Sequence, residues 1–500
     1  MLNEFYRQFK SGTDIRGVAT EGVEGQPVNL TDEVVAQMAD GFVLWLSEKV
    51  GKAPDALKIS VGRDSRVSGP HILQLCTERF CRAGAQVLCC GLASTPSMFM
   101  TTVDLGCDGA LQITASHHPF NRNGLKFFTR GGGLEGSDIE KILTFAQDGC
   151  HPDAADGGTV REVDYMSDYA KGLCEKIKRE VNAEDYDHPL KGFKIVVDAG
   201  NGAGGFYADK VLAVLGADTT GSRFLEPDGM FPNHVPNPED AVAMASISEA
   251  VRENHADLGV IFDTDVDRGG AVDSKGNEIN RNRLVAVAAA IALEGNDGGT
   301  VVTDSITSSG LKTFIETTLC GKHYRYRRGY KNVIDKALEL NAQGVNCPLA
   351  IETSGHAAMR ENYFLDDGAY LCTKIIIKAA QLRREGKELD ALTADLREPL
   401  ESREIRYRIT EKDFRACGER IIRDLTAYAE AQPDWQLADD NREGVRVSFD
   451  KDNGDGWFLL RLSVHDPIMP LNIESDSAGG VDVILNHLQA FLQTTEGLQL

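Results

Sequence analysis

The chain has 500 residues, of which 42% are hydrophobic and 26% are charged, and these proportions exclude a disordered or fibrous protein. Its 76 Asp and Glu residues outnumber 53 Lys and Arg residues, and the resulting net charge of −23 disfavours general binding to nucleic acid or anionic membranes. Because 500 residues exceed what one hydrophobic core usually serves, the length predicts several domains.

The beginning of the chain, MLNEFYRQFK, lacks the apolar core of a signal peptide. The most continuous apolar run, residues 284–293, has about half the length that a membrane span requires, so we expect a buried helix there. The 11 cysteines are scattered and form no CxxC pair, which favours reduced thiols over a disulfide framework or a zinc site. Together these features predict a cytoplasmic protein.

Short apolar segments rich in β-branched residues alternate with helical patterns through about residue 390. This alternation is typical of α/β layers and predicts a parallel or mixed sheet in each unit. The expected strands are 57–61, 86–90, 110–113, 194–197, 258–262 and 300–302, and the expected helices are 31–50, 68–83, 137–147 and 311–318.

The last hundred residues follow a different pattern. An alternating segment at 404–409 and a long helical pattern precede three strand candidates (445–449, 457–462 and 468–473) and a helix from about 482 to 493. Strands clustered between helices predict a small α+β domain. With linkers near 148–158 and 396–404, the expected domains are 1–158, 159–278, 279–397 and 398–500.

A glycine-rich segment, GNGAGG at residues 200–205, satisfies GxGxxG, follows an expected strand and opens a helical stretch. That context is the one required of a dinucleotide-binding fingerprint, and Glu226 lies where a ribose-binding acid would stand. A tight strand-to-helix turn also demands glycine. We therefore favour a structural turn and keep a nicotinamide-dependent oxidoreductase as an alternative.

Asp263, Asp265 and Asp267 alternate directly after the apolar segment LGVIF. The α/β folds place ligands at the carboxyl ends of strands, and carboxylate oxygens suit Mg²⁺. An EF-hand does not fit, because its sixth position is Arg268 rather than Gly and its twelfth is Ser274 rather than Glu. Three crowded aspartates repel one another, which favours a metal site over a solvated acidic turn.

A serine flanked by histidines occurs in TASHHP, residues 114–119, which also follows an expected strand. Adjacent Ser116 and His117 do not make a catalytic triad, and no GxSxG motif surrounds the serine, so an α/β-hydrolase is disfavoured. Arg122, Lys126 and Arg130 downstream provide positive charge that can steady a phosphoryl group. The alternative is a polar loop.

Three further segments carry donors and charges suited to polar or anionic ligands. The densest basic cluster, HYRYRRGYK at 323–331, indicates an anion site in an acidic protein, or else a basic edge with acidic neighbours. ETSGH at 352–356 ends an expected strand with sugar-compatible groups. Arg461 and Ser463 combine a guanidinium fork with a hydroxyl, which suits phosphate.

Taken in order, these segments resemble the α-D-phosphohexomutase superfamily of phosphomannomutases and phosphoglucomutases. SGTDIRG is similar to the opening loop of that family, TASHHP followed by NRNGLK to its phosphoserine loop, DTDVDRG to its metal loop and ETSGH to its sugar-recognition loop. The resemblance extends from Ser11 to Ile473. It implies three similar α/β domains with mixed sheets and a smaller C-terminal α+β domain around a central cleft.

The resemblance also implies roles for the matched residues. Ser116 would be the phosphoserine and would join three aspartates in holding one Mg²⁺ per chain. The implied catalytic residues are Ser116, His117, Arg16, Lys126, His356 and Arg268; the implied substrate-binding residues are Glu352, Ser354, Lys331, Arg461 and Ser463; and the implied metal ligands are Ser116, Asp263, Asp265 and Asp267.

The implied reaction interconverts hexose 1-phosphate and hexose 6-phosphate through the phosphoserine enzyme. A hexose 1,6-bisphosphate serves as intermediate and activator, and mannose or glucose phosphates are the expected substrates. A phosphoglucosamine mutase and a catalytically degenerate sugar-phosphate binder are the alternatives. We expect a monomer or dimer without nucleic-acid or membrane partners.

The chain departs from the family's usual pattern at a few positions. Val464 and His465 follow Ser463, where the family usually has Asn or Gly and then Thr. Tyr330 stands where many members have histidine, and His118 replaces the usual asparagine. These departures concern the phosphate clamp and the substrate more than the catalytic centre.

Overall fold

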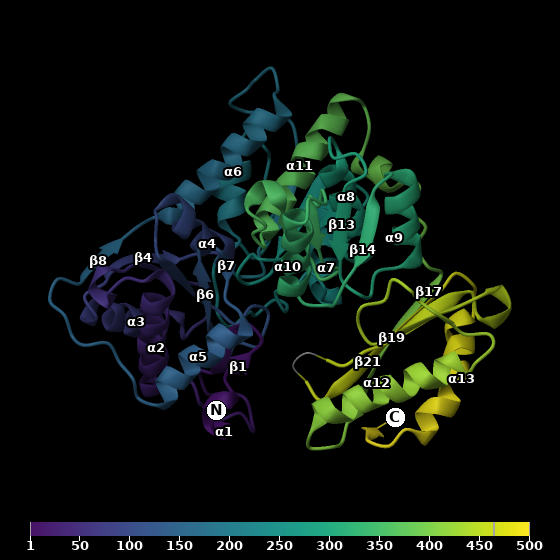
Figure 1. The fold of residues 1–500 in the computed structure, drawn as a ribbon. Coiled ribbons are helices and arrows are strands. Elements are labelled where there is room, and N and C mark those ends of the chain that lie inside the picture. The colour runs from purple at the N-terminus through teal and green to yellow at the C-terminus, as the bar shows by residue number, and fades with distance from the viewer. Residues whose placement is uncertain (1, 464–465, 500) are drawn as a thin grey trace. The chain divides into compact units, whose positions relative to one another are not determined.

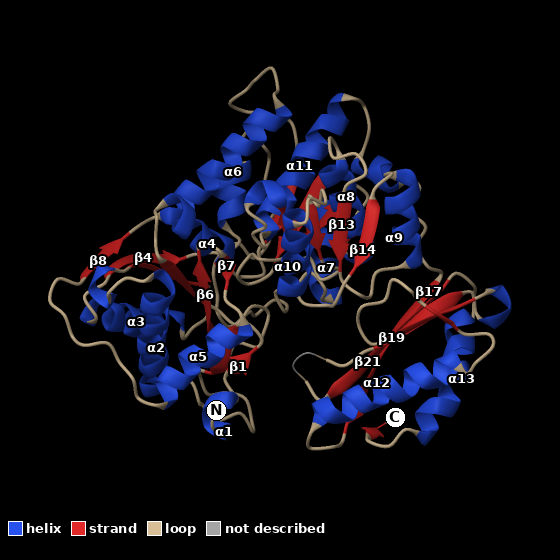
Figure 2. Ribbon diagram, in the orientation of Figure 1, coloured by secondary structure: helices blue, strands red, loops and turns tan. Residues whose placement is uncertain are grey.

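The computed structural model describes residues 2–463 and 466–499, so Val464 and His465 lie outside the described residues. The chain divides into two compact units. The first consists of residues 1–280, 354–358 and 365–391, and the second consists of residues 281–353, 359–364 and 392–500. The elements of both units are drawn in Figures 1 and 2.

The first unit opens with a mixed eight-stranded sheet, in the order β1-β2-β6-β5-β3-β4-β8, with β7 paired to β6. Strands β5, β3, β4 and β8 run parallel, whereas β2 and β6 are antiparallel to their neighbours. The strands are β1 (Lys10–Ser11), β2 (Asp14–Val18), β3 (Lys58–Arg63), β4 (Gln86–Leu92), β5 (Gly109–Ile113), β6 (Arg122–Thr129), β7 (Gly132–Gly133) and β8 (Thr159–Glu162).

Helices cover both faces of this sheet. The alternation of side chains along β3 separates the faces: Ile59 and Val61 join the core formed with α2, α3 and α5, whereas Ser60 hydrogen-bonds Thr101 of α4. Phe42 of α2 stacks on Phe127 of β6 with ring centroids 4.5 Å apart. The helices are α1 (Glu4–Arg7), α2 (Asp32–Val50), α3 (Gly69–Arg82), α4 (Thr95–Asp104) and α5 (Gly136–Gln147), which confirms the three predicted in this region.

The second sheet of the first unit has the order β12-β11-β10-β9. The parallel pair β9 (Ile195–Asp198) and β10 (Leu258–Phe262) is extended by the antiparallel strands β11 (Gly269–Asp273) and β12 (Glu278–Ile279). The same part of the first unit contains three helices and a π-helical segment: α6 (Tyr165–Val181), α7 (Ala241–Asn254), α11 (Gly368–Arg384) and η2 (Tyr207–Leu212). Helices α6 and α11 lie side by side (Figure 1), joined by an ion pair of 2.8 Å between Lys374 and Glu180.

The second unit contains a parallel trio in the order β14-β13-β15. Its elements are β13 (Thr300–Thr303), β14 (Lys322–Arg325), β15 (Leu349–Ile351), α8 (Arg281–Leu293), α9 (Ser309–Thr313), η3 (Phe314–Thr318) and α10 (Tyr330–Ala342), and β16 (Ala357–Met359) follows in the chain. The apolar run 284–293 forms the buried part of α8, as predicted. In the part of the chain that the structure describes, no helix is long and apolar enough to cross a membrane.

The C-terminal part is the predicted α+β domain. Its antiparallel sheet has the order β18-β19-β20-β21-β17-β22, and residues of α12 and α13 share one core with it. The elements are β17 (Glu401–Ile409), α12 (Phe414–Glu430), β18 (Gln436–Leu437), β19 (Val445–Phe449), β20 (Gly456–Leu460), β21 (Ile468–Ser475), α13 (Gly480–Thr494) and β22 (Leu498–Gln499). The α/β layers with mixed sheets and the α+β domain confirm the expected fold class.

Candidate active site

Ser116 lies in the loop between β5 and β6, and only 4% of its surface is exposed. Its hydroxyl donates to Asp263 Oδ2 at 3.2 Å and lies 3.2 Å from His117 Nδ1. The backbone at Ser116 has φ +51°, a left-handed conformation that costs a residue with a Cβ roughly 1–2 kcal/mol. Its amide donates to Thr114 Oγ1 at 2.9 Å, which supports this conformation.

The three aspartates lie in the turn that connects β10 to β11, fully buried. One carboxylate oxygen from each lies within 4.8 Å of the others. Burial, and then the charges of Asp267 and Asp265, raise the pKa of Asp263 well above its ordinary value. Burial would also raise the pKa of Asp267, but Lys126 and other nearby cations hold it below its ordinary value.

The donor set of this cluster fits a hard divalent cation. Three carboxylates share a buried space, and Asp265 Oδ1 and Asp267 Oδ1 accept no hydrogen bond from the described residues. Oxygen ligands of this kind are those that Mg²⁺ binds, and a cation would relieve the mutual repulsion. The structure therefore brings together the predicted Asp263, Asp265 and Asp267, with the Ser116 hydroxyl at their edge.

Cationic side chains surround the cluster within the first unit. Lys126 of β6 donates to Asp267 Oδ2 at 2.7 Å, and this buried ion pair links the first sheet to the aspartate turn. The Arg268 amide donates to Asp263 Oδ1 at 3.2 Å. Arg16 of β2 lies 3.1 Å from Asp14 through its guanidinium. These cations provide positive charge where a phosphoryl group on Ser116 would need it.

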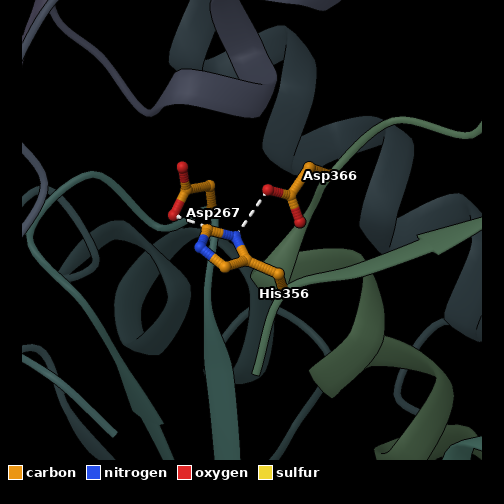
Figure 3. A group of neighbouring side chains, drawn as sticks. All are labelled: Asp267, His356 and Asp366. Atoms are coloured by element: carbon orange, nitrogen blue, oxygen red, sulfur yellow. Dashed lines mark hydrogen bonds and ion pairs between the residues drawn. The ribbon is translucent and has the colours of Figure 1, made fainter. Parts of the chain in front are cut away.

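His356 is held between three side chains of the first unit, Arg268, Asp267 and Asp366, of which Figure 3 shows the two aspartates. Its Nδ1 lies 2.6 Å from Asp366 Oδ2 and 3.7 Å from Asp267 Oδ1. Arg268 Nε donates to His356 Nε2 at 2.8 Å, so the ring proton is assigned to Nδ1, from which it is donated to Asp366. A histidine whose tautomer is fixed by a carboxylate is equipped for proton transfer.

Sequence reasoning did not identify Asp366 or Thr95, and the structure places both in the site. Asp366 follows His356 by ten residues in a segment without a recognisable motif. Thr95, at the start of α4, donates its hydroxyl to Asp265 Oδ2 at 2.5 Å. Neither position carries a local signal, because each contact depends on how distant segments pack.

Both histidines after Ser116 are neutral at ordinary pH. Burial, followed by the charge of Arg268, lowers the pKa of His117 far below its ordinary value. Burial, followed by Arg16 and Arg66, lowers the pKa of His118 to about 3. The charges that depress these pKa values form a local positive field in an acidic protein, which suits an anionic ligand.

The ETSGH loop contributes to both units. Its second half belongs to the first unit, where Ser354 is buried, the Gly355 carbonyl accepts from the Gly269 amide at 3.3 Å, and His356 bridges to Arg268. In the second unit, Glu352 accepts from the Gly329 amide at 2.6 Å.

The remaining predicted residues, Lys331, Arg461 and Ser463, lie in the second unit. Lys331 Nζ contacts both carboxylate oxygens of Asp335, at 2.8 and 2.9 Å. Arg461 is buried, and burial lowers the pKa of its guanidinium. The Ser463 hydroxyl accepts from the Asp466 amide at 3.3 Å.

Within the basic cluster at 323–331, Arg325 has a structural role. Arg325 is buried and donates to Asp440 Oδ2 at 2.8 Å and to Thr307 Oγ1 at 3.1 Å. Its charge is balanced inside the second unit, as in the alternative of a basic edge with acidic neighbours. Arg325 therefore differs from the residues expected to face an anion.

The glycine-rich segment at 200–205 is packed against protein, as the structural-turn prediction requires. A Cβ on Gly202 would lie 2.6 Å from the Thr264 carbonyl oxygen, and one on Gly205 would lie 2.2 Å from the Leu225 carbonyl oxygen. The space that a dinucleotide pyrophosphate would occupy at these two positions is filled by backbone. The geometry gives no support to the nicotinamide alternative.

Three family models match the chain in order. The alpha/beta/alpha domains I, II and III of phosphoglucomutase/phosphomannomutase match residues 8–149, 168–276 and 280–400. These matches cover both the Ser116 loop and the aspartate turn.

Relatives match over nearly the whole length. A phosphoglucomutase from Neisseria meningitidis serogroup A is 28% identical over 97% of this chain and 96% of its own length. A phosphoglucosamine mutase from Lactobacillus acidophilus is 30% identical over 91% of this chain and 94% of its own. The fold is shared with a solved phosphoglucomutase/phosphomannomutase family protein from Burkholderia thailandensis, with a TM-score of 0.79, 24% identity and coverage of 99% and 98% of the two chains.

Proposed function

Because the chain belongs to the phosphoglucomutase/phosphomannomutase family, we propose that it is an isomerase that interconverts hexose 1-phosphates and hexose 6-phosphates. The observation that carries this proposal is the Ser116 hydroxyl, 3.2 Å from Asp263 Oδ2 at the edge of a buried acidic cluster. We assign glucose and mannose phosphates as substrates. Phosphoglucosamine mutase is the second candidate, because a relative of that name is 30% identical.

We assign the acidic cluster to one Mg²⁺, held by Asp263, Asp265, Asp267 and the oxygen of Ser116. When bound, the ion neutralises charge that develops on the phosphoryl group during transfer. In its absence, Lys126 already offsets part of the carboxylate charge through its 2.7 Å contact with Asp267. The same ammonium orients Asp267, so that its second oxygen stays available.

The transfer is a displacement at phosphorus. A sugar hydroxyl attacks the phosphoryl group on Ser116, the new O–P bond forms as the bond to Ser116 Oγ breaks, and the hydroxyl proton leaves to a base. We assign His356 as that base: Asp366 holds the ring proton on Nδ1 at a distance of 2.6 Å, and Nε2 takes the hydroxyl proton when the Arg268 Nε donor, 2.8 Å away, releases that nitrogen. His117, which is neutral, remains a hydrogen-bond partner for the serine oxygen at 3.2 Å.

The product of the first transfer is a hexose 1,6-bisphosphate. After it turns over, its other phosphoryl group returns to Ser116, which restores the phosphoserine and releases the isomerised sugar phosphate. We assign Glu352 and Ser354 to sugar hydroxyls, and Lys331, Arg461 and Ser463 to the phosphate that does not react. Arg16 and Arg268 provide positive charge beside the reacting group.

Ser116→Ala tests the proposal. Intact mass should show one phosphoryl group on the purified wild-type protein and none on the variant. With Mg²⁺ and a trace of bisphosphate, the variant should lose at least about 10³-fold in kcat on glucose 1-phosphate or mannose 1-phosphate. Ser137→Ala, at an exposed position in α5, is the matched control and should retain both properties.

Two outcomes would contradict the proposal. Mutase activity retained by Ser116→Ala would remove the serine from the reaction. Sugar-phosphate binding by the wild-type protein without turnover on glucose, mannose or glucosamine 1-phosphate would instead support the degenerate binder.

A further inference from the structure

Arg66 is a buried arginine that binds backbone carbonyls of the Ser116 loop. It follows β3, has 0% of its surface exposed, and its two terminal nitrogens donate to four carbonyl oxygens. One nitrogen donates to Pro119 at 2.7 Å and to Arg122 at 2.8 Å. The other donates to His118 at 2.6 Å and to Ser116 itself.

The guanidinium is itself fixed in place from two sides. Asp64 Oδ2 lies 3.2 Å from Arg66 Nε, and Asp64 Oδ1 accepts from the Arg66 amide at 2.9 Å. The Asp64 amide donates to the Ile113 carbonyl at 3.0 Å, which ties this support to the end of β5. The Phe231 ring lies 5.2 Å from the guanidinium carbon.

The backbone carbonyls of the Ser116 loop need such donors, because the loop leaves the sheet and, in the part of the chain that the structure describes, has no strand partner there. Two backbone bonds close turns within it, from the His118 amide to Ala115 at 3.1 Å and from the Arg122 amide to Pro119 at 3.0 Å. Arg66 binds carbonyls in both turns, so it fixes each turn relative to the other. Buried carbonyls without donors are costly, and Ser116 also has an unfavourable φ of +51°.

We propose that Arg66 is a positioning residue for the reaction, which holds the Ser116 loop in the one conformation that directs the serine oxygen at the acidic cluster. The inference rests on the proposed function, because that function assigns the phosphoryl group to Ser116. A planar guanidinium with two donors on each terminal nitrogen can bind four carbonyls at once, whereas an ammonium has three donors at a single point. Replacing Arg66 with lysine therefore keeps a positive charge beside Asp64 but removes the planar donors that bind four carbonyls.

Arg66→Lys is the test, with Arg79→Lys as the matched control. Arg79 donates to buried Asp40 at 2.9 Å in the same domain, and among the described residues it makes no hydrogen bond or ion pair with the Ser116 loop, so its replacement weakens a partly buried ion pair without touching the site. Arg66→Lys should lower kcat by about 10- to 100-fold and change KM for hexose 1-phosphate by less than about threefold. Arg79→Lys should retain wild-type kcat.

Hydrogen exchange gives a readout that is independent of turnover. In Arg66→Lys, the amides of residues 114–122 should exchange at least about tenfold faster than in the wild type, while α2 and α3 keep their protection. Arg79→Lys should show the reverse distribution. Since Arg66→Lys can fail to fold, the double variant Asp64→Asn/Arg66→Met, which removes both buried charges together, repeats the exchange measurement.

Unchanged exchange at 114–122 in both Arg66 variants would overturn the inference, and so would a kcat for Arg66→Lys equal to that of Arg79→Lys. Failure of the proposed function is distinguishable, because wild-type protein would then lack the phosphoryl group and turnover altogether. In that case the exchange result alone decides whether Arg66 holds the loop.

Discussion

Gly202→Ala tests whether the glycine-rich segment holds the aspartate turn in place. Gly202 lies against Thr264, the residue between Asp263 and Asp265, and the neighbouring Ala203 amide donates to the Thr264 carbonyl at 2.8 Å. The φ of Gly202 is not in the left-handed region, so alanine adds a methyl group without adding backbone strain.

The size of the perturbation follows from the contact distances. The added Cβ would lie 2.6 Å from the Thr264 carbonyl oxygen, and ordinary contact begins at 3.4 Å, so this oxygen must move by about 0.8 Å. Overpacking of this kind costs about 1–3 kcal/mol of folding free energy. A displacement close to 1 Å at a catalytic turn lowers kcat by as much as about 10²-fold.

The assay is steady-state mutase activity as a function of Mg²⁺ concentration, with thermal unfolding measured in parallel. Gly202→Ala should lower kcat and raise the Mg²⁺ concentration needed for half activation. Gly172→Ala is the control, because nothing lies within 4 Å of its added methyl group on α6, and it should leave kcat unchanged. A Gly202→Ala variant with wild-type kcat and wild-type Mg²⁺ activation would refute the reasoning.

Two other predictions concern buried charges. Lys126→Met breaks the buried 2.7 Å ion pair with Asp267, and should lower the unfolding free energy by about 3–5 kcal/mol without Mg²⁺. Mg²⁺ at 100 times the variant's own Kd should raise the variant's unfolding free energy by about 2.7 kcal/mol, and a urea midpoint of the variant that does not change with Mg²⁺ would contradict this. Burial raises the pKa of Glu474 to about 7, so the folded state retains a proton that the unfolded chain releases near pH 4.5. Stability should therefore fall by up to about 3 kcal/mol as pH rises from about 4.5 to about 7, and Glu474→Gln should remove this slope in urea midpoints; an unchanged slope would contradict it.

The strands that carry the site were predictable from local pattern. LGVIF forms β10 with the bounds expected, and the three aspartates emerge at its carboxyl end with their carboxylates together. The strand expected at 110–113 forms β5 (Gly109–Ile113), which places Ser116 in the loop after it. Both results follow because a short apolar segment bounded by polar residues has few ways to be buried except as a strand in a layered sheet.

The partners of these residues were not predictable in the same way. Arg66 and Ser116 are 50 positions apart in the chain, and Arg325 and Asp440 are 115 apart. The sequence around each arginine does not distinguish a structural role from an anion site. That difference depends on which carboxylate or carbonyl the fold brings beside the guanidinium. The sequence therefore leaves the role of the basic cluster at 323–331 ambiguous and does not identify Arg66.

The two loops at the centre of the site share a property that links these observations. Each contains a non-glycine residue whose backbone lies in the left-handed region, Ser116 at φ +51° and Val266 at φ +68°. For the β-branched Val266 this φ is a genuine outlier. Such conformations persist only where the surroundings determine them, and here the supports are distinct: Arg66 binds the carbonyls of the serine loop, and Gly202 packs against the aspartate turn. The 3.2 Å contact from Ser116 to Asp263 is thus set by residues that do not touch the reacting groups. It follows that Arg66→Lys and Gly202→Ala should each lower kcat while Ser116 and the three aspartates remain intact.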